Sequence, residues 1–185
     1  MSGKSEENEM GRKIDIGGME LYYELLGENS DEPTLVFDSG YGWELKNWNP
    51  ISEQVSKFAR MFVYDRAGLG ESETDGRSHD SQQAVENLRV LLGKANVKPP
   101  YVLVGHSFGG LNVRLFASTY PDEVSGVILL DSCHEDQNEK MAPLFKKSEI
   151  CISVNSMLKG HWKNLNRTLN KPELADHSVT SHSLS

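Results

Sequence analysis

The fold is decided by one stretch of the sequence, Tyr101-Val-Leu-Val-Gly-His-Ser-Phe-Gly-Gly110. Its first four residues are apolar and mostly β-branched or aromatic, which predicts a short buried strand. Apolar residues then recur at helical spacing from Leu111 to Tyr120, so a helix follows the strand. Between the two lies a Gly-X-Ser-X-Gly pattern, which runs from Gly105 to Gly109.

The serine of this pattern, Ser107, stands where the predicted strand turns into the predicted helix. A serine at such a sharp turn has a strained backbone, and its neighbours must be small for the turn to close. The turn lifts the hydroxyl clear of the sheet and points the unpaired N–H groups of the helix N-terminus at whatever the hydroxyl attacks. We therefore predict that Ser107 is a nucleophile. The alternative is a glycine-rich turn with a solvated serine, which does not account for a strand and a helix in register on its two sides.

The alternation of strands and helices extends outward from this stretch. Apolar strand-like runs at residues 34–38, 60–65 and 124–131 are separated by helical patterns. Strands that alternate with helices of about 10 to 15 residues predict right-handed βαβ units. The expected fold class is α/β, with a mostly parallel sheet and helices on both of its faces.

The ends of the chain differ from this central part. Residues 1–12 are polar and acidic and are predicted to be disordered. Residues 13–136 form the predicted core, which starts with a β-hairpin split by Gly17-Gly18. In residues 137–185 the periodicity fails, so we expect a partial lid-like or irregular segment that ends in a disordered tail rich in Ser, Thr and His.

The amino-acid composition limits the kinds of molecule that the protein is expected to bind and the compartment in which it is expected to act. The net charge of −8 argues against nucleic acids and anionic membranes. No apolar run is long enough to span a membrane, and the N-terminus lacks the apolar core of a signal peptide. Two cysteines, Cys133 and Cys151, suit a reducing compartment better than a disulfide framework, so a cytoplasmic location is expected. The scattered histidines lack partners at metal-ligand spacing, and neither a metal nor a cofactor is implied.

Three motifs together resemble the α/β-hydrolase superfamily. They are the Gly105–Gly110 pattern, Asp38-Ser-Gly-Tyr-Gly-Trp43 after an earlier strand, and Tyr64-Asp-Arg-Ala-Gly-Leu-Gly-Glu-Ser72 after the strand between them. The resemblance covers roughly residues 13–136 and identifies the sixth strand of the fold with residues 124–131. In this family further strands usually follow the sixth, so the resemblance implies a sheet that is truncated at its C-terminal side.

The resemblance implies roles for individual residues. Ser107 matches the nucleophile of a serine hydrolase. The backbone N–H groups of Phe108 and Tyr41 match the two donors of an oxyanion hole, which stabilise the negative charge that develops on a carbonyl oxygen under attack. Asp65 and Arg66 match a set of residues that shapes a loop. A small-molecule substrate is the partner that these roles imply.

The base and the acid of a catalytic triad are harder to assign. In this fold the acid and the histidine follow the serine along the chain. Asp131, at the end of the sixth strand, is the candidate acid, and its alternative role is that of a polar strand terminus. His161, which follows Gly160, is the candidate base.

Two classes of function follow from this pattern. The first is a serine hydrolase that acts on a small ester, thioester or amide. The second is a non-catalytic, truncated hydrolase-like protein or binding module that lacks the catalytic histidine. A truncated sheet would also expose the edge of the sixth strand and allow the chain to self-associate there.

Overall fold

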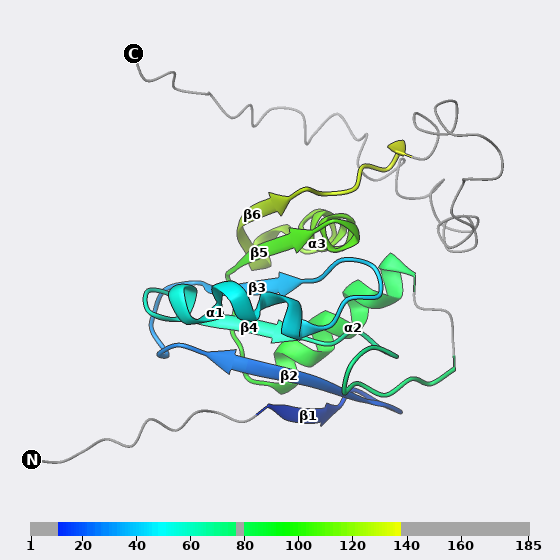
Figure 1. Cartoon of the computed structure of the whole chain (residues 1–185), viewed down its shortest axis with the longest axis horizontal. Helices are drawn as coiled ribbons and strands as arrows, with labels where there is room; N and C mark the ends of the chain where they lie inside the picture. The colour runs from blue at the N-terminus through cyan, green and yellow to red at the C-terminus, as the bar shows by residue number, and fades with distance from the viewer. Residues whose placement is uncertain (1–10, 77–79, 138–185) are drawn as a thin grey trace, which may run out of the picture.

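A mixed sheet of six strands forms the centre of the computed structural model, which describes residues 11–76 and 80–137. The strands lie in the order β1-β2-β4-β3-β5-β6 (Figure 1). Their bounds are β1 Arg12–Asp15, β2 Glu20–Leu26, β3 Thr34–Asp38, β4 Met61–Tyr64, β5 Tyr101–His106 and β6 Val124–Leu130. The helices are α1 Asn49–Ser56, α2 Ser81–Lys94 and α3 Phe108–Thr119, with 3-10 turns η1 at Leu45–Trp48 and η2 at Pro121–Glu123.

The sheet is parallel except at its first two strands. β1 and β2 form an antiparallel hairpin, and β2 then pairs antiparallel with β4. β3 pairs parallel with both β4 and β5, and β5 pairs parallel with β6. The predicted α/β class and the mostly parallel sheet are confirmed. β3 ends at Asp38, as its apolar run predicted. β4 and β6 each stop one residue before the predicted ends at 65 and 131, because the chain there turns into the loops that follow the strands.

Side chains alternate between the two faces of the sheet, and each face has its own apolar core. On β4, Phe62 belongs to the core beneath α2 and α3, whereas Met61 and Val63 belong to the core beneath η1 and α1. This period of two follows from the pleat of a strand. The α2–α3 core is the larger one and includes Leu88 and Phe116, both almost fully buried. The expectation of helices on both faces is confirmed (Figure 1).

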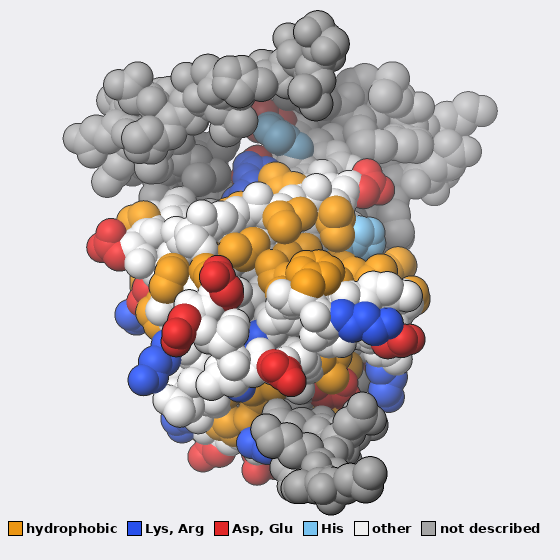
Figure 2. Space-filling model, turned by 90° about the vertical axis from the view of Figure 1, so that its left-hand side faces the viewer, with side chains coloured by type: hydrophobic (Ala, Val, Ile, Leu, Met, Phe, Trp, Pro, Cys, Tyr) orange, Lys and Arg blue, Asp and Glu red, His pale blue; other side chains and the backbone are white. Residues whose placement is uncertain are grey.

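β6 is the last strand of the sheet in the described ranges, and its apolar side chains are only half covered. The side chains from Val127 to Leu130 are each between 39% and 45% exposed. Figure 2 shows hydrophobic side chains gathered in the upper half of the described molecule, which in Figure 1 contains β5 and β6. The predicted lid-like segment and tail at residues 137–185 lie outside the described residues, apart from residue 137 itself.

No helix within residues 11–76 and 80–137 combines the length and the apolar character that crossing a bilayer requires.

Candidate active site

Ser107 lies at the turn between β5 and α3. β5 ends at His106 and α3 begins at Phe108, so Ser107 is the residue that caps the helix. Its backbone angles, φ 50° and ψ −116°, fall in a region that side-chain-bearing residues rarely occupy. The strained serine predicted from the sequence is therefore confirmed. Strain of this kind costs of order 1–3 kcal/mol and is kept only where the surrounding structure imposes it.

Close packing of glycines allows this turn to form. A Cβ atom on Gly109 would lie 2.1 Å from the carbonyl oxygen of Asp38, at the end of β3. A Cβ atom on Gly105 would lie 2.6 Å from the Cα of Gly110, in the first turn of α3. Both distances are too short for any side chain, and both partners are backbone atoms that cannot move aside cheaply. The two glycines of the motif thus let α3 pack directly against β3 and β5.

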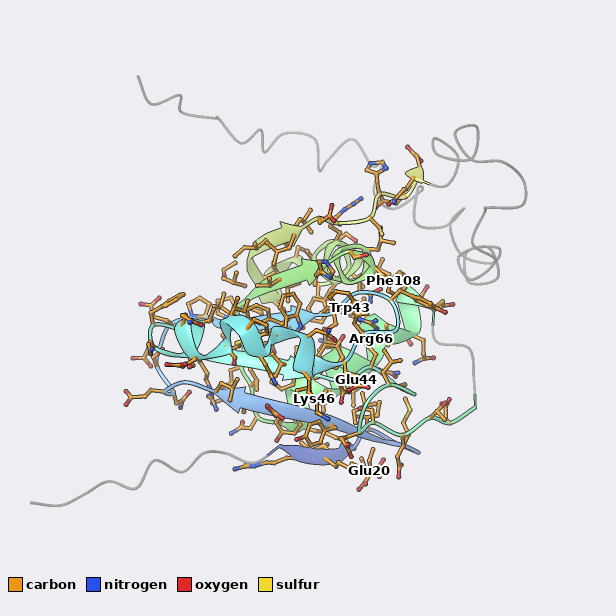
Figure 3. All side chains as sticks on the ribbon, in the orientation of Figure 1. Glu20, Trp43, Glu44, Lys46, Arg66 and Phe108 are labelled. Carbon is orange, nitrogen blue, oxygen red and sulfur yellow. The ribbon has the colours of Figure 1, made fainter. Side chains whose placement is uncertain are left out.

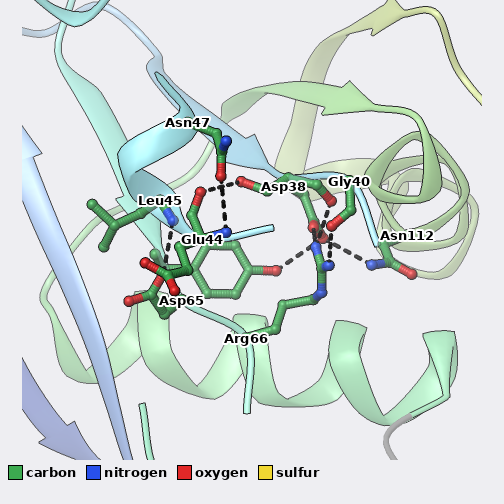
Figure 4. Close-up of polar contacts among 10 residues, drawn as sticks. Asp38, Gly40, Glu44, Leu45, Asn47, Asp65, Arg66 and Asn112 are labelled. Atoms are coloured by element: carbon green, nitrogen blue, oxygen red, sulfur yellow. Dashed lines mark hydrogen bonds and ion pairs between the residues drawn. The ribbon is translucent and has the colours of Figure 1, made fainter. Parts of the chain in front are cut away.

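A buried carboxylate, that of Asp38, lies beneath this turn and joins four segments of the chain (Figure 4). Its Oδ2 accepts hydrogen bonds from the Tyr64 hydroxyl at 2.9 Å and from Nδ2 of Asn112 at 3.0 Å. Its Oδ1 forms an ion pair with Arg66. The side chains of Asp38 and Arg66 are only 1% and 10% exposed, so these bonds replace water that the two charges have lost.

Arg66 also binds the backbone that follows β3. Its guanidinium donates to the carbonyl oxygens of Ser39 and Gly40, each at 2.5 Å. Its charged end lies 5.5 Å from the centre of the Phe108 ring. Figure 3 shows Arg66 and Phe108 near each other, toward the ends of the parallel strands. Arg66 therefore connects the loop after β3 with the start of α3.

Asp65 shapes the neighbouring loop, as its place in the sequence motif predicted. Its carboxylate accepts the backbone N–H of Leu45 at 2.7 Å and that of Glu71 at 3.0 Å. Burial raises the pKa of Asp65, and the two N–H donors offset only part of that effect. Since the carboxylate holds η1 against the loop after β4, its role here is to order backbone.

The two predicted oxyanion donors lie beside Ser107. Phe108 follows it directly, and the ring of Tyr41 packs edge-on against the Phe108 ring with centroids 5.9 Å apart. A Cβ atom on Gly40, the residue before Tyr41, would lie 3.5 Å from the Cβ of Ser107. Within the described residues, neither the Tyr41 nor the Phe108 backbone N–H makes a hydrogen bond. Two such donors beside a serine hydroxyl could bind an anionic oxygen.

The loop after β6 supplies a contact that the sequence did not indicate. The Ser107 hydroxyl lies 3.5 Å from the Cys133 sulfur. The backbones are also joined, because Ser107 N–H donates to the Leu130 carbonyl at 3.2 Å and Cys133 N–H donates to the Ser107 carbonyl at 3.0 Å. A cysteine three residues beyond the end of a strand does not by itself indicate a contact with the serine. Only the register of β5 against β6 brings Cys133 next to Ser107.

Within the described part of the chain, neither the candidate acid nor a histidine is bonded to the Ser107 hydroxyl. Asp131 is exposed, one residue beyond β6, with φ 44°. His106 packs against the rings of Trp43 and Trp48. His134 uses its Nδ1 to accept the backbone N–H of Asp136 at 3.1 Å. His161 lies outside the described residues.

Comparison with known proteins gives a consistent result. Residues 33–157 match the model of the family described as alpha/beta hydrolase fold. The chain is 36% identical over 104 residues to the uncharacterized protein YqjL of Bacillus subtilis (strain 168), a match that covers 56% of this chain and 41% of YqjL. It is 33% identical over 126 residues to the uncharacterized protein YbdG of the same organism, covering 65% of this chain and 37% of YbdG.

Solved structures agree with the sequence matches. The enol-lactonase from Burkholderia xenovorans LB400 is similar with a TM-score of 0.59 at 26% sequence identity, covering 63% of this chain and 45% of that one. The chain thus spans about two fifths of the length of the curated relatives that it matches.

The bond from Tyr64 to Asp38 gives a prediction about stability and pH. Burial raises the pKa of Tyr64 well above its usual value of 10.0, and the Asp38 carboxylate adds to the shift. Tyr64→Phe should lower the free energy of unfolding at pH 7 by about 1–3 kcal/mol, because a buried carboxylate loses a donor. Above pH 10 the unfolded Tyr64 ionises while the folded one stays neutral, so the wild type loses more stability than the variant as pH rises.

The difference in the free energy of unfolding between the wild type and Tyr64→Phe should therefore shrink by about 1.4 kcal/mol for each pH unit above 10. Urea unfolding of both proteins at pH 7, 10 and 11 measures it. A difference that stays constant across this range would contradict the assignment of a buried, neutral Tyr64.

The strain at Ser107 gives a second prediction. Ser107→Gly and Ser107→Ala both remove the hydroxyl, but only glycine reaches φ 50°, ψ −116° without strain. The glycine variant should be more stable than the alanine variant by about 1–2 kcal/mol in denaturant unfolding. The same pair of changes at Ser52, inside α1, should give the opposite order, since alanine is favoured in a helix by about 1 kcal/mol. The same order at both positions would argue against a strained serine.

Proposed function

We propose that this chain, which belongs to the α/β-hydrolase fold family, is a serine hydrolase that attacks a small ester, thioester or amide. The observation that carries the proposal is the geometry of Ser107. Its hydroxyl stands on a strained turn between β5 and α3, at the helix N-terminus, where unpaired N–H groups are available. Strained residues cluster at active sites, and here the strained residue presents a hydroxyl rather than a packing side chain.

The proposed reaction begins when Oγ of Ser107 forms a bond to the carbonyl carbon of the substrate. The carbonyl oxygen becomes negatively charged and accepts hydrogen bonds from the Tyr41 and Phe108 N–H groups. The alcohol, thiol or amine then leaves with a proton, and the acyl group stays on Ser107 until water releases it. Losing one such donor typically costs about 3 kcal/mol of transition-state stabilisation.

The proton of Ser107 needs a base. We assign this role to His161, with Asp131 as the acid that orients it, following the chain order expected for the fold. The assignment of His161 is supported by the sequence, and that of Asp131 also by its position in the fold. Asp131 lies directly after β6, the strand whose Leu130 carbonyl binds the Ser107 backbone N–H.

The alternative is a non-catalytic hydrolase-like protein or binding module without a working base. The contact of the Ser107 hydroxyl favours this alternative, because within residues 11–76 and 80–137 its partner is the Cys133 sulfur rather than a histidine. A serine without a base is a weak nucleophile. The two functions differ in whether Ser107 is activated.

A fluorophosphonate probe, which reacts with activated serines, separates the two functions. We expect the wild-type chain to be labelled, and Ser107→Ala and His161→Ala to lose labelling by about 10³-fold or more, as removal of a nucleophile or base does. His177→Ala and His182→Ala are matched controls, since both residues lie in the same C-terminal segment, and each should label like the wild type.

The possible results assign the function directly. Loss of labelling in Ser107→Ala alone would retain the hydrolase and exclude His161 as its base. Absence of labelling in a wild-type chain that unfolds cooperatively would reject the enzyme and leave the non-catalytic alternative.

We also propose that the chain self-associates through β6. The proposal is supported by the half-exposed apolar side chains from Val127 to Leu130 and by the absence of a charged residue within the strand. Ile128→Lys should reduce association, because lysine on an edge strand opposes pairing. Phe58→Lys, which changes an apolar side chain that is 77% exposed beyond α1, is the control and should leave association unchanged. Sedimentation velocity over a range of concentrations measures the effect, and a wild-type monomer throughout would refute it.

A further inference from the structure

The structure assigns Arg66 a second task besides its ion pair: we propose that it is a positioning residue that orients the Gly40–Tyr41 peptide and strengthens the Tyr41 N–H as an oxyanion donor. The inference rests on the proposed function, because it concerns the same site. It goes beyond that function by assigning a role to a residue that does not contact the substrate. Arg66 would influence the reaction by orienting the Gly40–Tyr41 peptide.

The geometry places the guanidinium across the loop after β3. One nitrogen, Nη1, donates to the Ser39 carbonyl and to the Asp38 carboxylate, and the other, Nη2, donates to the Gly40 carbonyl (Figure 4). Two successive carbonyls of the loop are thus held by one rigid, planar group. A planar fork fixes direction as well as distance, which a single point charge does not.

Holding the Gly40 carbonyl also fixes the Tyr41 N–H. The two groups belong to one peptide unit, and in a trans peptide they point in opposite directions. The Gly40 oxygen is held by Arg66 at 2.5 Å and also accepts the Trp43 N–H at 3.2 Å. Because its oxygen has two partners, the peptide plane cannot rotate freely, and the Tyr41 N–H is directed away from the guanidinium.

The charge of Arg66 adds to this effect. A cation at the carbonyl end of a peptide draws electron density toward the oxygen, which makes the N–H of the same unit a better donor. The interaction acts in a region with little water, since the Arg66 side chain is 10% exposed. The donor is consequently polarised before any substrate binds, and it needs no rearrangement when negative charge develops.

The ion pair alone does not explain this arrangement. Asp38 already has two neutral donors, Tyr64 and Asn112, on its Oδ2. A lysine at position 66 could neutralise the remaining Oδ1, but it could not hold both carbonyls in a fixed plane. The contacts to Ser39 and Gly40 are therefore what distinguishes arginine from lysine at this position.

Arg66→Lys in the full 185-residue chain is the test variant, because it keeps the charge and removes the planar fork. Arg89→Lys is the matched control. Arg89 also uses two nitrogens, both on Glu123, and it stacks on Tyr120 at the other end of the sheet. Urea unfolding of both variants shows whether each is folded, and Arg66→Gln provides a second, neutral variant of the same residue.

The first readout does not depend on activity. The 15N resonance of Tyr41 reports hydrogen bonding at the Gly40 carbonyl, since both belong to one peptide unit. We expect this resonance to move upfield in Arg66→Lys and further in Arg66→Gln, and to stay in place in Arg89→Lys. An unchanged Tyr41 resonance in folded Arg66 variants would overturn the proposal, whether or not the chain is an enzyme.

The second readout is the reaction itself. Fluorophosphonate labelling of Ser107 should slow about 10²-fold in Arg66→Gln, as expected for a misdirected oxyanion donor, and less in Arg66→Lys. With 4-nitrophenyl acetate, kcat should fall while KM stays within about twofold, because the interaction is made only in the transition state. A displaced Tyr41 resonance with unchanged labelling would reject the contribution to catalysis. A wild-type chain that is never labelled would reject the proposed hydrolase instead.

Discussion

The structure depends on one buried ion pair, that of Asp38 and Arg66. Burying two charges is costly unless they are paired and hydrogen-bonded, and removing one partner of such a pair typically costs about 3–5 kcal/mol. Here Tyr64 and Asn112 donate further hydrogen bonds to the Asp38 carboxylate, and two backbone carbonyls accept the remaining hydrogen bonds of Arg66. The pair therefore fixes the ends of β3 and β4 against α3, and it does so directly beneath the turn that carries Ser107.

At this turn the unfavourable energy of a strained backbone is offset by the favourable energy of close packing. Ser107 has an unfavourable backbone, and the structure compensates by packing α3 so tightly that Gly109 nearly touches the carbonyl of Asp38. A helix that close to a sheet gains dispersion contacts over its whole length, among them those of Phe116 in the larger core. The strained residue is stable because its neighbours leave it no other conformation.

The two sides of the sheet differ in how far they are covered. One edge strand of the described sheet, β1, consists mostly of charged residues, whereas the other, β6, has half-exposed apolar side chains. A strand of that kind pairs readily with another chain. The same strand carries Asp131 and the Cys133 loop at its end, so whatever covers β6 would also affect the surroundings of Ser107.

The sequence by itself determined the α/β class, the order of the elements and the strained serine, because these follow from local periodicity and from glycines around one residue. The end of β3 was predicted correctly, but the ends of β4 and β6 were predicted one residue too late, since apolar patterns do not show where pairing stops. The sequence also identified Asp65 and Arg66 as loop-shaping. The tertiary structure alone decided that Arg66 binds Asp38 and two carbonyls, and that Cys133 contacts Ser107. These contacts join residues that are 26 to 28 positions apart, and only the pairing of β3, β4, β5 and β6 fixes which of them meet.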